Sequence, residues 1–460
     1  MNLPEKIIVL FLIGFIFRFV LELLYPYSAI GFDQMGYYVP MLYTNANPIN
    51  YFSVGFLYYL IAYSINLLLK DPVWTIKLLD AITSGIFILS LYSFSEFGIK
   101  NKYSFFISII AFFSFQSLIL DWSLQRNILA FSIFLFTFYF YENSRKNIFM
   151  IILFTIISGM FDPAIIPLEF FWFLYLSFKE KKFAAVLLTI IAITLILIFS
   201  GIFEPSITGF TENNIMAFII GFFVSGNILS DIFIYASLVA LLFIPFLVFL
   251  PLMKNYNFKN DFAFKIPIIA TFIFSSIAVF SFFFRYLIEL SVISILFIKD
   301  PKKYKIIFSL FIIIIFLISA SFISMSNYYP SPYFYNSVTK NSGLNDIVST
   351  SFLQSTVPLN DSKIVVKLFS YVKGNDSMVV SMLYMVSFAY ESGINPKNVI
   401  NTGENYSQFL NDCKYYSSNG YSVYTVWWIN NGWYGITQLP SEFKEIKIIG
   451  NYALFFYGNK

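Results

Sequence analysis

The stretch IIVLFLIGFIFRFVLELLY, residues 7–25, decides the fold class of this chain. It is almost entirely apolar, and it is long enough to cross the core of a bilayer, which takes about 20 residues of helix. No small-residue cleavage site follows it, so it is predicted to be an uncleaved first membrane span. Arg18 and Glu22 interrupt the stretch four residues apart, and the simplest interpretation is an ion pair within one helix.

The composition of the whole chain also indicates a membrane protein. Hydrophobic residues make up 58% of the 460 residues and charged residues 12%, whereas soluble proteins have about 45–50% and about 25%. A soluble protein of this length would have too little charge to cover its surface. The net charge of +4 is too small to indicate a nucleic-acid partner.

Several kinds of chemistry are excluded by residue types that the chain lacks. There is no His, which excludes a His base, a His metal ligand and a Ser-His-Asp triad. A single Cys, Cys413, excludes internal disulfides and CxxC metal sites. Glycine loops that bind nucleotide phosphates are absent as well. Ionic chemistry must therefore rest on Asp, Glu, Lys, Arg and Tyr.

Apolar segments along residues 1–324 predict a polytopic helical protein with about 11 transmembrane helices. Two further apolar stretches, residues 51–69 and 215–229, are interpreted as an outer interfacial helix and a re-entrant stretch. That placement puts most basic loops on the inner side, although a full span at residues 51–69 remains the alternative. The expected spans are residues 7–25, 73–97, 103–120, 128–141, 148–161, 164–178, 183–203, 232–253, 266–284, 286–298 and 306–324.

The composition changes after residue 324, and residues 325–460 are predicted to form a small α/β domain outside the cytoplasm. An odd number of spans places the domain on that side. All three Asn-x-Ser/Thr sequons lie in it, which agrees with an outer location. The patterns predict strands near residues 378–383, 398–400 and 421–428, helices at residues 384–392 and 406–417, and a hairpin within residues 446–457.

Charged residues on the outer side of this topology are the candidate functional residues, because charge near a membrane is costly. Asp33 lies in GFDQMGYY, residues 31–38, and is the only charged residue between residues 26 and 69. Asp121 and Arg126 lie in the short second outer loop, and Asp162 lies at the outer end of the fifth span. Arg285 marks the outer end of the ninth span. For Arg126 and Arg285, snorkelling or helix capping is the alternative to a functional role.

The order of these features resembles the GT-C superfamily of membrane glycosyltransferases, and within it the protein mannosyltransferase and aminoarabinose transferase branch with its archaeal relatives. Asp33 stands at the family's first-loop acidic position, and Gly55-Phe56-Leu57-Tyr58-Tyr59 stands where the family often has Pro-Pro-Leu-Tyr-Tyr. Residues 121–141 resemble the second loop and fourth span, and residues 156–170 resemble the turn between the fifth and sixth spans. The likeness covers roughly residues 1–180.

The resemblance implies an enzyme, integral to the cell membrane, that takes a sugar from a polyprenyl (dolichyl) phosphate donor at the outer face. It passes the sugar, with inversion, to a glycan, protein or lipid acceptor. Asp33 is then the catalytic carboxylate, which takes the acceptor's proton or orients its hydroxyl. Arg126 and Arg285 are the expected clamps for the donor phosphate, because a guanidinium binds two phosphate oxygens at once.

The same resemblance assigns supporting roles to other outer residues. Asp121 and Asp162 form an acidic rim that either orients sugar hydroxyls or binds a divalent cation, and the sequence leaves both open. Tyr37, Tyr58 and Tyr59 are candidate aromatic contacts for the substrate.

Other functions remain open alternatives. VWWINNGWYGI, residues 426–436, resembles the WWDYG signature of the oligosaccharyltransferase catalytic subunit without its Asp. A secondary transporter or flippase for a lipid-linked or small polar substrate would instead show inverted repeats and charges near the midplane. No clear internal repeat is visible and the charges lie mostly at span ends, which favours the transferase. A noncatalytic protein that binds sugar lipids is the third possibility.

Overall fold

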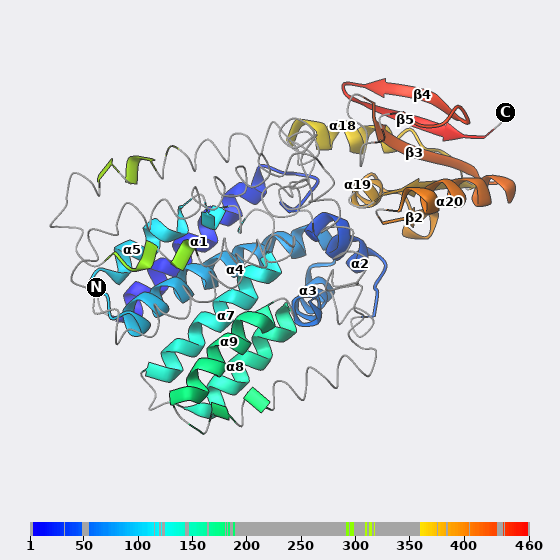
Figure 1. Cartoon of the computed structure of the whole chain (residues 1–460). Helices are drawn as coiled ribbons and strands as arrows, with labels where there is room; N and C mark the ends of the chain where they lie inside the picture. Colours follow the sequence, from blue (N-terminus) through cyan, green and yellow to red (C-terminus); the bar gives the residue numbers. More distant parts are fainter. Residues whose placement is uncertain are drawn as a thin grey trace, which may run out of the picture.

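The computed structural model describes a helical region and a C-terminal α/β region (Figure 1). The expected spans at residues 232–253 and 266–284, the stretch at residues 215–229, and Arg285 lie outside the described residues. The described residues are 3–31, 33–47, 55–114, 116–118, 121, 125–142, 147–162, 165–179, 181, 183–184, 187–188, 291–293, 295–298, 309–310, 312–314, 317, 359–374, 376–382, 385–403, 405–429, 436 and 438–458.

Two long helices, α1 (Leu3–Leu23) and α4 (Pro72–Ser93), pack closely against each other in the helical region (Figure 1). A Cβ atom on Gly14 of α1 would lie 2.5 Å from the carbonyl oxygen of Ser84 in α4. A Cβ atom on Gly85 would lie 2.7 Å from the ring of Phe11. The two glycines therefore let the backbones approach, as small residues do where helices cross in membranes.

The start of α4 follows from its sequence. Asp71 precedes the helix, and its side chain accepts a hydrogen bond of 3.0 Å from the backbone N–H of Trp74. Pro72 occupies the first helical position, where no N–H is needed. Among the residues that the structure describes, Pro72–Gly98 is the one stretch long and apolar enough to span a membrane by length and composition. The total number of spans stays a prediction.

Four further helices follow in the order that the apolar segments predict. α7 packs along α8 and also against α4, so these three form the centre of the helical region (Figure 1). Asn147 starts α8 by accepting a hydrogen bond of 3.2 Å from the N–H of Met150. The four helices are α5 (Ser104–Phe112), α7 (Gln125–Glu142), α8 (Ile148–Phe161) and α9 (Ile166–Lys179).

The expected span at residues 103–120 is not one continuous helix, because α5 ends at Phe112 and helical residues resume at 116–118. Beyond it, the hydroxyls of Ser114 and Ser117 donate to the carbonyl oxygen of Ala111, at 2.7 Å and 2.5 Å. Serine side chains of this kind compete with the backbone N–H groups that would continue the helix. The apolar pattern does not show this competition, since it depends on hydroxyl geometry.

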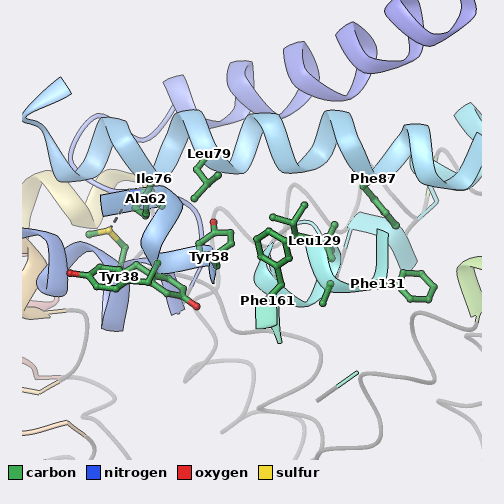
Figure 2. Packing of buried hydrophobic residues seen from close by; sticks show 14 of the residues in the cluster. Tyr38, Tyr58, Ala62, Ile76, Leu79, Phe87, Leu129, Phe131 and Phe161 are labelled. Carbon is green, nitrogen blue, oxygen red and sulfur yellow. Dashed lines mark hydrogen bonds between the residues drawn. The ribbon is translucent and has the colours of Figure 1, made fainter. Parts of the chain in front are cut away.

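Aromatic residues fill the space beneath α4. Figure 2 shows Phe87 of α4 near Phe131 and Leu129 of α7, with Phe161 of α8 beside them. Deeper in the bundle, the rings of Phe138 and Trp172 stack with centroids 4.2 Å apart. Ring pairs of this kind add about 0.5–1.5 kcal/mol beyond their buried area, so these buried rings serve as packing.

The loop between α1 and α4 is itself helical. A π-helical turn, η1 (Gln34–Tyr38), leads directly into α2 (Val39–Tyr43), and α3 (Phe56–Leu69) follows after a short gap. At 14 residues, α3 is about 21 Å long, whereas a bilayer core is about 30 Å thick. Its length favours the interfacial placement over a full span, and its position in a membrane stays a prediction.

The C-terminal region contains a five-stranded sheet with the strand order β2-β1-β3-β5-β4. β1 pairs parallel with β2 and β3, while β5 pairs antiparallel with β3 and β4. The strands and helices predicted from the sequence occur within a few residues of their expected positions. The elements are α18 (Leu359–Phe369), β1 (Ser377–Ser381), α19 (Met385–Glu391), η8 (Pro396–Asn398), β2 (Val399–Asn401), α20 (Tyr406–Ser418), β3 (Ser422–Trp428), β4 (Phe443–Ile449) and β5 (Tyr452–Tyr457).

The tryptophan pair of residues 426–436 belongs to the core of this sheet. Trp427 and Trp428 are 2% and 3% exposed, and the ring of Trp427 packs 5.6 Å from that of Phe409 in α20. The pair therefore stabilises the sheet, which removes one reason for the oligosaccharyltransferase interpretation. The rest of the motif, residues 430–435, lies outside the described residues.

We predict that Gly14→Val separates α1 from α4, because its Cβ would overlap the Ser84 carbonyl. The expected loss of stability is about 1–3 kcal/mol, the usual effect of overpacking, measured as thermal unfolding of the detergent-solubilised chain. Ile16→Val on the exposed face of α1 is the matched control. Equal unfolding temperatures for the two variants would contradict the close crossing.

Candidate functional site

Arg126 lies between two carboxylates that come from different parts of the chain. Its Nε atom is 3.6 Å from Oδ2 of Asp33 and 3.5 Å from Oδ2 of Asp162. Asp33 directly precedes η1, Arg126 lies in the first turn of α7, and Asp162 directly follows α8. The three side chains are 9%, 15% and 4% exposed, respectively. We call this group the Arg126 cluster.

The guanidinium of Arg126 stays charged in this setting. Burial disfavours its charged form, but Asp33, Tyr38 and Asp162 more than offset this effect and raise the pKa of Arg126. Arg126 also hydrogen-bonds the Tyr38 side chain. Burial raises the pKa of Tyr38 as well, so its phenol stays protonated near neutral pH. The Arg126 cluster therefore contains a fixed positive charge with a hydroxyl beside it.

Gly55 closes one side of the Arg126 cluster, although it is not among the site residues expected from the sequence. A Cβ atom on Gly55 would lie 2.7 Å from the carbonyl oxygen of Phe161, 3.0 Å from the Tyr38 hydroxyl and 3.2 Å from Cδ of Arg126. Its φ of +85° also belongs to the left-handed region that favours glycine. The feature of the sequence that could have indicated this role is a glycine directly before the aromatic start of α3.

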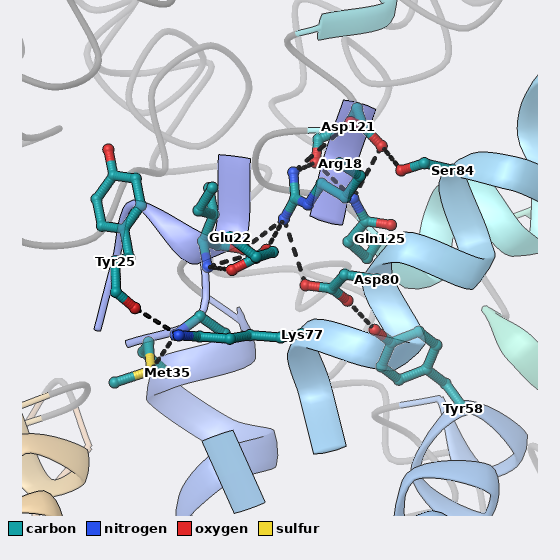
Figure 3. Close-up of polar contacts among 12 residues, drawn as sticks. Arg18, Glu22, Tyr25, Met35, Tyr58, Lys77, Asp80, Ser84, Asp121 and Gln125 are labelled. Atoms are coloured by element: carbon teal, nitrogen blue, oxygen red, sulfur yellow. Dashed lines mark hydrogen bonds and ion pairs between the residues drawn. The ribbon is translucent and has the colours of Figure 1, made fainter. Parts of the chain in front are cut away.

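A second charged group is centred on Arg18, in the interior of the helical region (Figure 3). Arg18 pairs with Glu22 at 2.8 Å, which confirms the predicted contact within α1. It also pairs with Asp80 of α4 at 3.3 Å and with Asp121 at 3.7 Å. All four side chains are almost completely buried. We call these four residues, together with Lys77 of α4, whose charge acts on Glu22, the Arg18 network.

The Arg18 network holds the chain that leads to Asp33. Glu22 accepts a hydrogen bond of 3.0 Å from the N–H of Ile30, and Arg18 donates one of 2.8 Å to the Ile30 carbonyl. Lys77 of α4 donates to the carbonyl oxygen of Tyr25 at 2.5 Å (Figure 3). Charge-assisted hydrogen bonds such as these are the strong ones in proteins. They fix residues 25–30 against α1 and α4.

Asp121 belongs to the Arg18 network and not to the Arg126 cluster. Besides Arg18, its carboxylate accepts hydrogen bonds from Ser84 and, at 3.0 Å, from Gln125 (Figure 3). Of the two residues expected on an acidic rim beside Asp33, the structure therefore brings only Asp162 to Arg126. Arg285, the other expected phosphate clamp, lies outside the described residues.

The three candidate tyrosines lie in different settings. Tyr58 is fully buried and donates to Oδ1 of Asp80 at 2.5 Å. Tyr59 is also buried and donates to the Ala46 carbonyl at 2.8 Å, which ties α3 to the turn that follows α2. These two tyrosines hold the loop in place. Tyr37 is partly exposed and lines a cavity, so it remains a candidate for substrate contact.

Tyr58 also connects the two charged groups. Its ring packs against that of Tyr38 with centroids 4.8 Å apart, and Tyr38 is the hydroxyl neighbour of Arg126. The Asp80 carboxylate, the two phenols and Arg126 therefore follow one another through the interior.

A cavity of about 560 Å³ falls in the size range of small-molecule sites. It lies where η1 and α2 meet the C-terminal region. Within the described part of the chain, no three Asp, Glu, His or Cys residues cluster as metal ligands would, and the divalent cation stays an open alternative. The cavity is lined by Gly36, Tyr37, Pro40, Met41, Thr44, Tyr390, Val399, Ile400 and Asn401.

We predict that Arg126→Gln destabilises the protein by about 3–5 kcal/mol, because it leaves two buried carboxylates facing each other without a cation. Thermal unfolding in detergent measures the loss. The double variant Arg126→Gln/Asp162→Asn should recover part of it, since one of the two unpaired charges is removed. A double variant less stable than the single one would contradict the contact.

We predict that Gly55→Ala is more destabilising than Gly393→Ala by about 1–3 kcal/mol. The two glycines share a left-handed conformation, with φ of +85° and +89°. Only at Gly55 would the new methyl group meet neighbouring atoms, because nothing lies within 4 Å of a Cβ on Gly393. The difference in unfolding temperature therefore isolates the contact with the Arg126 cluster. Equal losses would exclude close packing at Gly55.

No protein-family model matches this chain, and no curated protein sequence matches it either. The function must therefore be inferred from the residues of the chain itself.

Proposed function

We propose that this protein is a membrane glycosyltransferase that moves a sugar from a polyprenyl phosphate donor to a hydroxyl-bearing acceptor at the outer membrane face. The observation that carries the proposal is the contact of Asp33 with Arg126 at 3.6 Å. A carboxylate and a guanidinium that lie far apart in the sequence share one buried position. These are the two groups that such a transfer needs.

The chemistry assigns one role to each group. The acceptor oxygen forms a bond to the anomeric carbon of the sugar, while the bond from that carbon to the phosphate oxygen breaks. Asp33 takes the proton from the acceptor hydroxyl, a contribution of about 10²–10⁴ in rate. The electron pair of the broken bond leaves with the phosphate, and Arg126 stabilises that charge. Attack from the face opposite the phosphate inverts the anomeric carbon.

The distances in the Arg126 cluster support a site that can bind an anion. Separations of 3.5–3.6 Å are ion pairs, but they are longer than direct hydrogen bonds, which measure about 2.7–3.2 Å. Catalytic contacts are often long without substrate and shorten when it binds. A phosphate oxygen can therefore compete for the guanidinium, whose planar fork suits it. Release from Arg126 would at the same time free Asp33 to act as a base.

The charge of the Arg126 cluster sets a further requirement. One guanidinium faces two carboxylates, so the described members of the cluster carry a net negative charge. The donor is a phosphodiester monoanion, and its binding requires more positive charge than these residues supply. Arg285 is the cation that the sequence offers for this purpose. Its position relative to Asp33 remains a prediction.

A cation- or proton-coupled transporter is the second candidate, and one observation favours it. In the Arg18 network, Arg18 and Lys77 face the three carboxylates of Glu22, Asp80 and Asp121. Arg18, Lys77 and Asp80 lie within α1 and α4, and buried charges inside membrane helices are typical of transporters. Substrate-driven proton flux in sealed proteoliposomes, with no release of polyprenyl phosphate, would favour this function.

We predict that Asp33→Asn lowers sugar transfer by about 10²–10⁴, because an amide cannot take the acceptor's proton. The assay measures release of polyprenyl phosphate from polyprenyl phosphate–sugar donors in proteoliposomes, with oligosaccharide, peptide and lipid acceptors present. Thermal stability should change little, because Arg126 keeps its contact with Asp162.

Asp71→Asn is the matched control, since Asn caps a helix about as well as Asp does and Asp71 serves as the cap of α4. Its transfer rate should equal that of the wild type. Undiminished transfer by Asp33→Asn would remove Asp33 from the mechanism. No transfer by the wild type with any such donor would reject the glycosyltransferase itself.

A further inference from the structure

In the described part of the chain, the short helix α19 contacts the loop that carries Asp33. The hydroxyl of Ser387 donates to the carbonyl oxygen of Met35 in η1 at 2.5 Å. The hydroxyl of Tyr43 at the end of α2 donates to Oε1 of Glu391, also at 2.5 Å. Ser387 and Glu391 are four residues apart and therefore share one face of α19. That face follows the η1–α2 segment from one end to the other.

The η1 turn is an element that needs outside support. Its π-helical hydrogen bonds are rare in proteins and are found mostly at functional sites. Met35 connects it to both sides, because its sulfur accepts a hydrogen bond of 3.3 Å from the N–H of Ala29 while its carbonyl accepts from Ser387. Asp33 lies immediately before this turn. The position of its carboxylate therefore depends on how firmly η1 is held.

The rest of the contact between α19 and the η1–α2 segment is only partly packed. The rings of Tyr43 and Tyr390 lie 4.9 Å apart and close one end. Beside them is the cavity of about 560 Å³, bounded by η1 and α2 on one side and by α19 and β2 on the other. Apolar contact across an open cavity cannot fix the register of two elements. The hydrogen bonds Ser387–Met35 and Tyr43–Glu391 therefore fix the position of α19 along the η1–α2 segment.

We propose that α19 is a positioning element, and that Ser387 and Glu391 hold the η1–α2 segment so that Asp33 faces Arg126. Neither residue touches the reacting groups, and both act through the backbone of η1 and the side chain of Tyr43. The positioning of a catalytic Asp33 rests on the proposed function, whereas the holding of η1 does not. The C-terminal region thereby becomes a part of the site.

Hydrogen exchange of the full-length chain in lipid nanodiscs tests the holding directly. Ser387→Ala should raise the exchange rate of backbone amides in residues 34–43 by about threefold to tenfold, the range expected for one hydrogen bond. Amides of α4 should not change. Ser392→Ala is the matched control, because its hydroxyl donates to Ala389 at 2.7 Å within the same part of the chain. Unchanged exchange in residues 34–43 would overturn the proposal.

Tyr43→Phe keeps the proposal testable if Ser387→Ala fails to fold. It preserves the ring contact with Tyr390 and removes only the hydroxyl that binds Glu391. The same amides should exchange faster, and Tyr43→Phe combined with Glu391→Gln should add nothing to the single change. Fully additive effects would show that the two side chains do not act together.

Kinetics separate a positioning role from a binding role. Ser387→Ala should lower kcat about threefold to tenfold, with KM for the polyprenyl phosphate–sugar donor unchanged, and Ser387→Thr should restore most of it. Faster exchange with unchanged kcat would overturn the positioning of Asp33. If the wild type transfers no sugar, the proposed function fails, and the exchange data still decide whether α19 holds η1.

Discussion

The site depends on one buried guanidinium shared by two carboxylates. Arg126 meets Asp33 and Asp162 only when η1, α7 and α8 are packed together. A charge removed from water is costly unless it is paired, and an unpaired partner costs several kcal/mol. The packing of these elements therefore places Arg126 against both carboxylates. Gly55 makes the packing possible, because any larger residue would occupy the space of the Arg126 stem and the Tyr38 hydroxyl.

The Arg18 network fixes the first loop, and the Arg126 cluster joins the start of α7 to the end of α8. The Arg18 network fixes residues 25–30 through bonds from Arg18, Glu22 and Lys77, and the loop then delivers Asp33 to Arg126. The rings of Tyr58 and Tyr38 join the two groups. Such a network is a poor source of stability, since desolvation offsets much of the attraction, but it selects one arrangement of the loop over others. Under the proposed function, that selection keeps the base and the phosphate clamp at a fixed distance from each other.

The C-terminal region adds a third constraint on the same loop. α19 bonds to Met35 and Tyr43, so the segment that bears Asp33 is held by the helices on one side and by the α/β region on the other. The cavity between the η1–α2 segment and the α/β region is lined by Tyr37, which lies one turn after Asp33. Under the proposed function, the acceptor approaches Asp33 through this cavity, and the α/β region both lines the cavity and positions Asp33 as the base.

The sequence alone determined the features that depend on neighbours along the chain. The apolar runs located the described helices, the strand patterns located the strands, and the spacing of Arg18 and Glu22 predicted their pair. Only the tertiary structure decided that Asp162 joins Arg126 while Asp121 joins Arg18, that Tyr58 and Tyr59 are buried, and that Gly55 closes the cluster. The physical reason is that local patterns follow backbone periodicity, whereas the partner of a buried charge is set by which helices pack together.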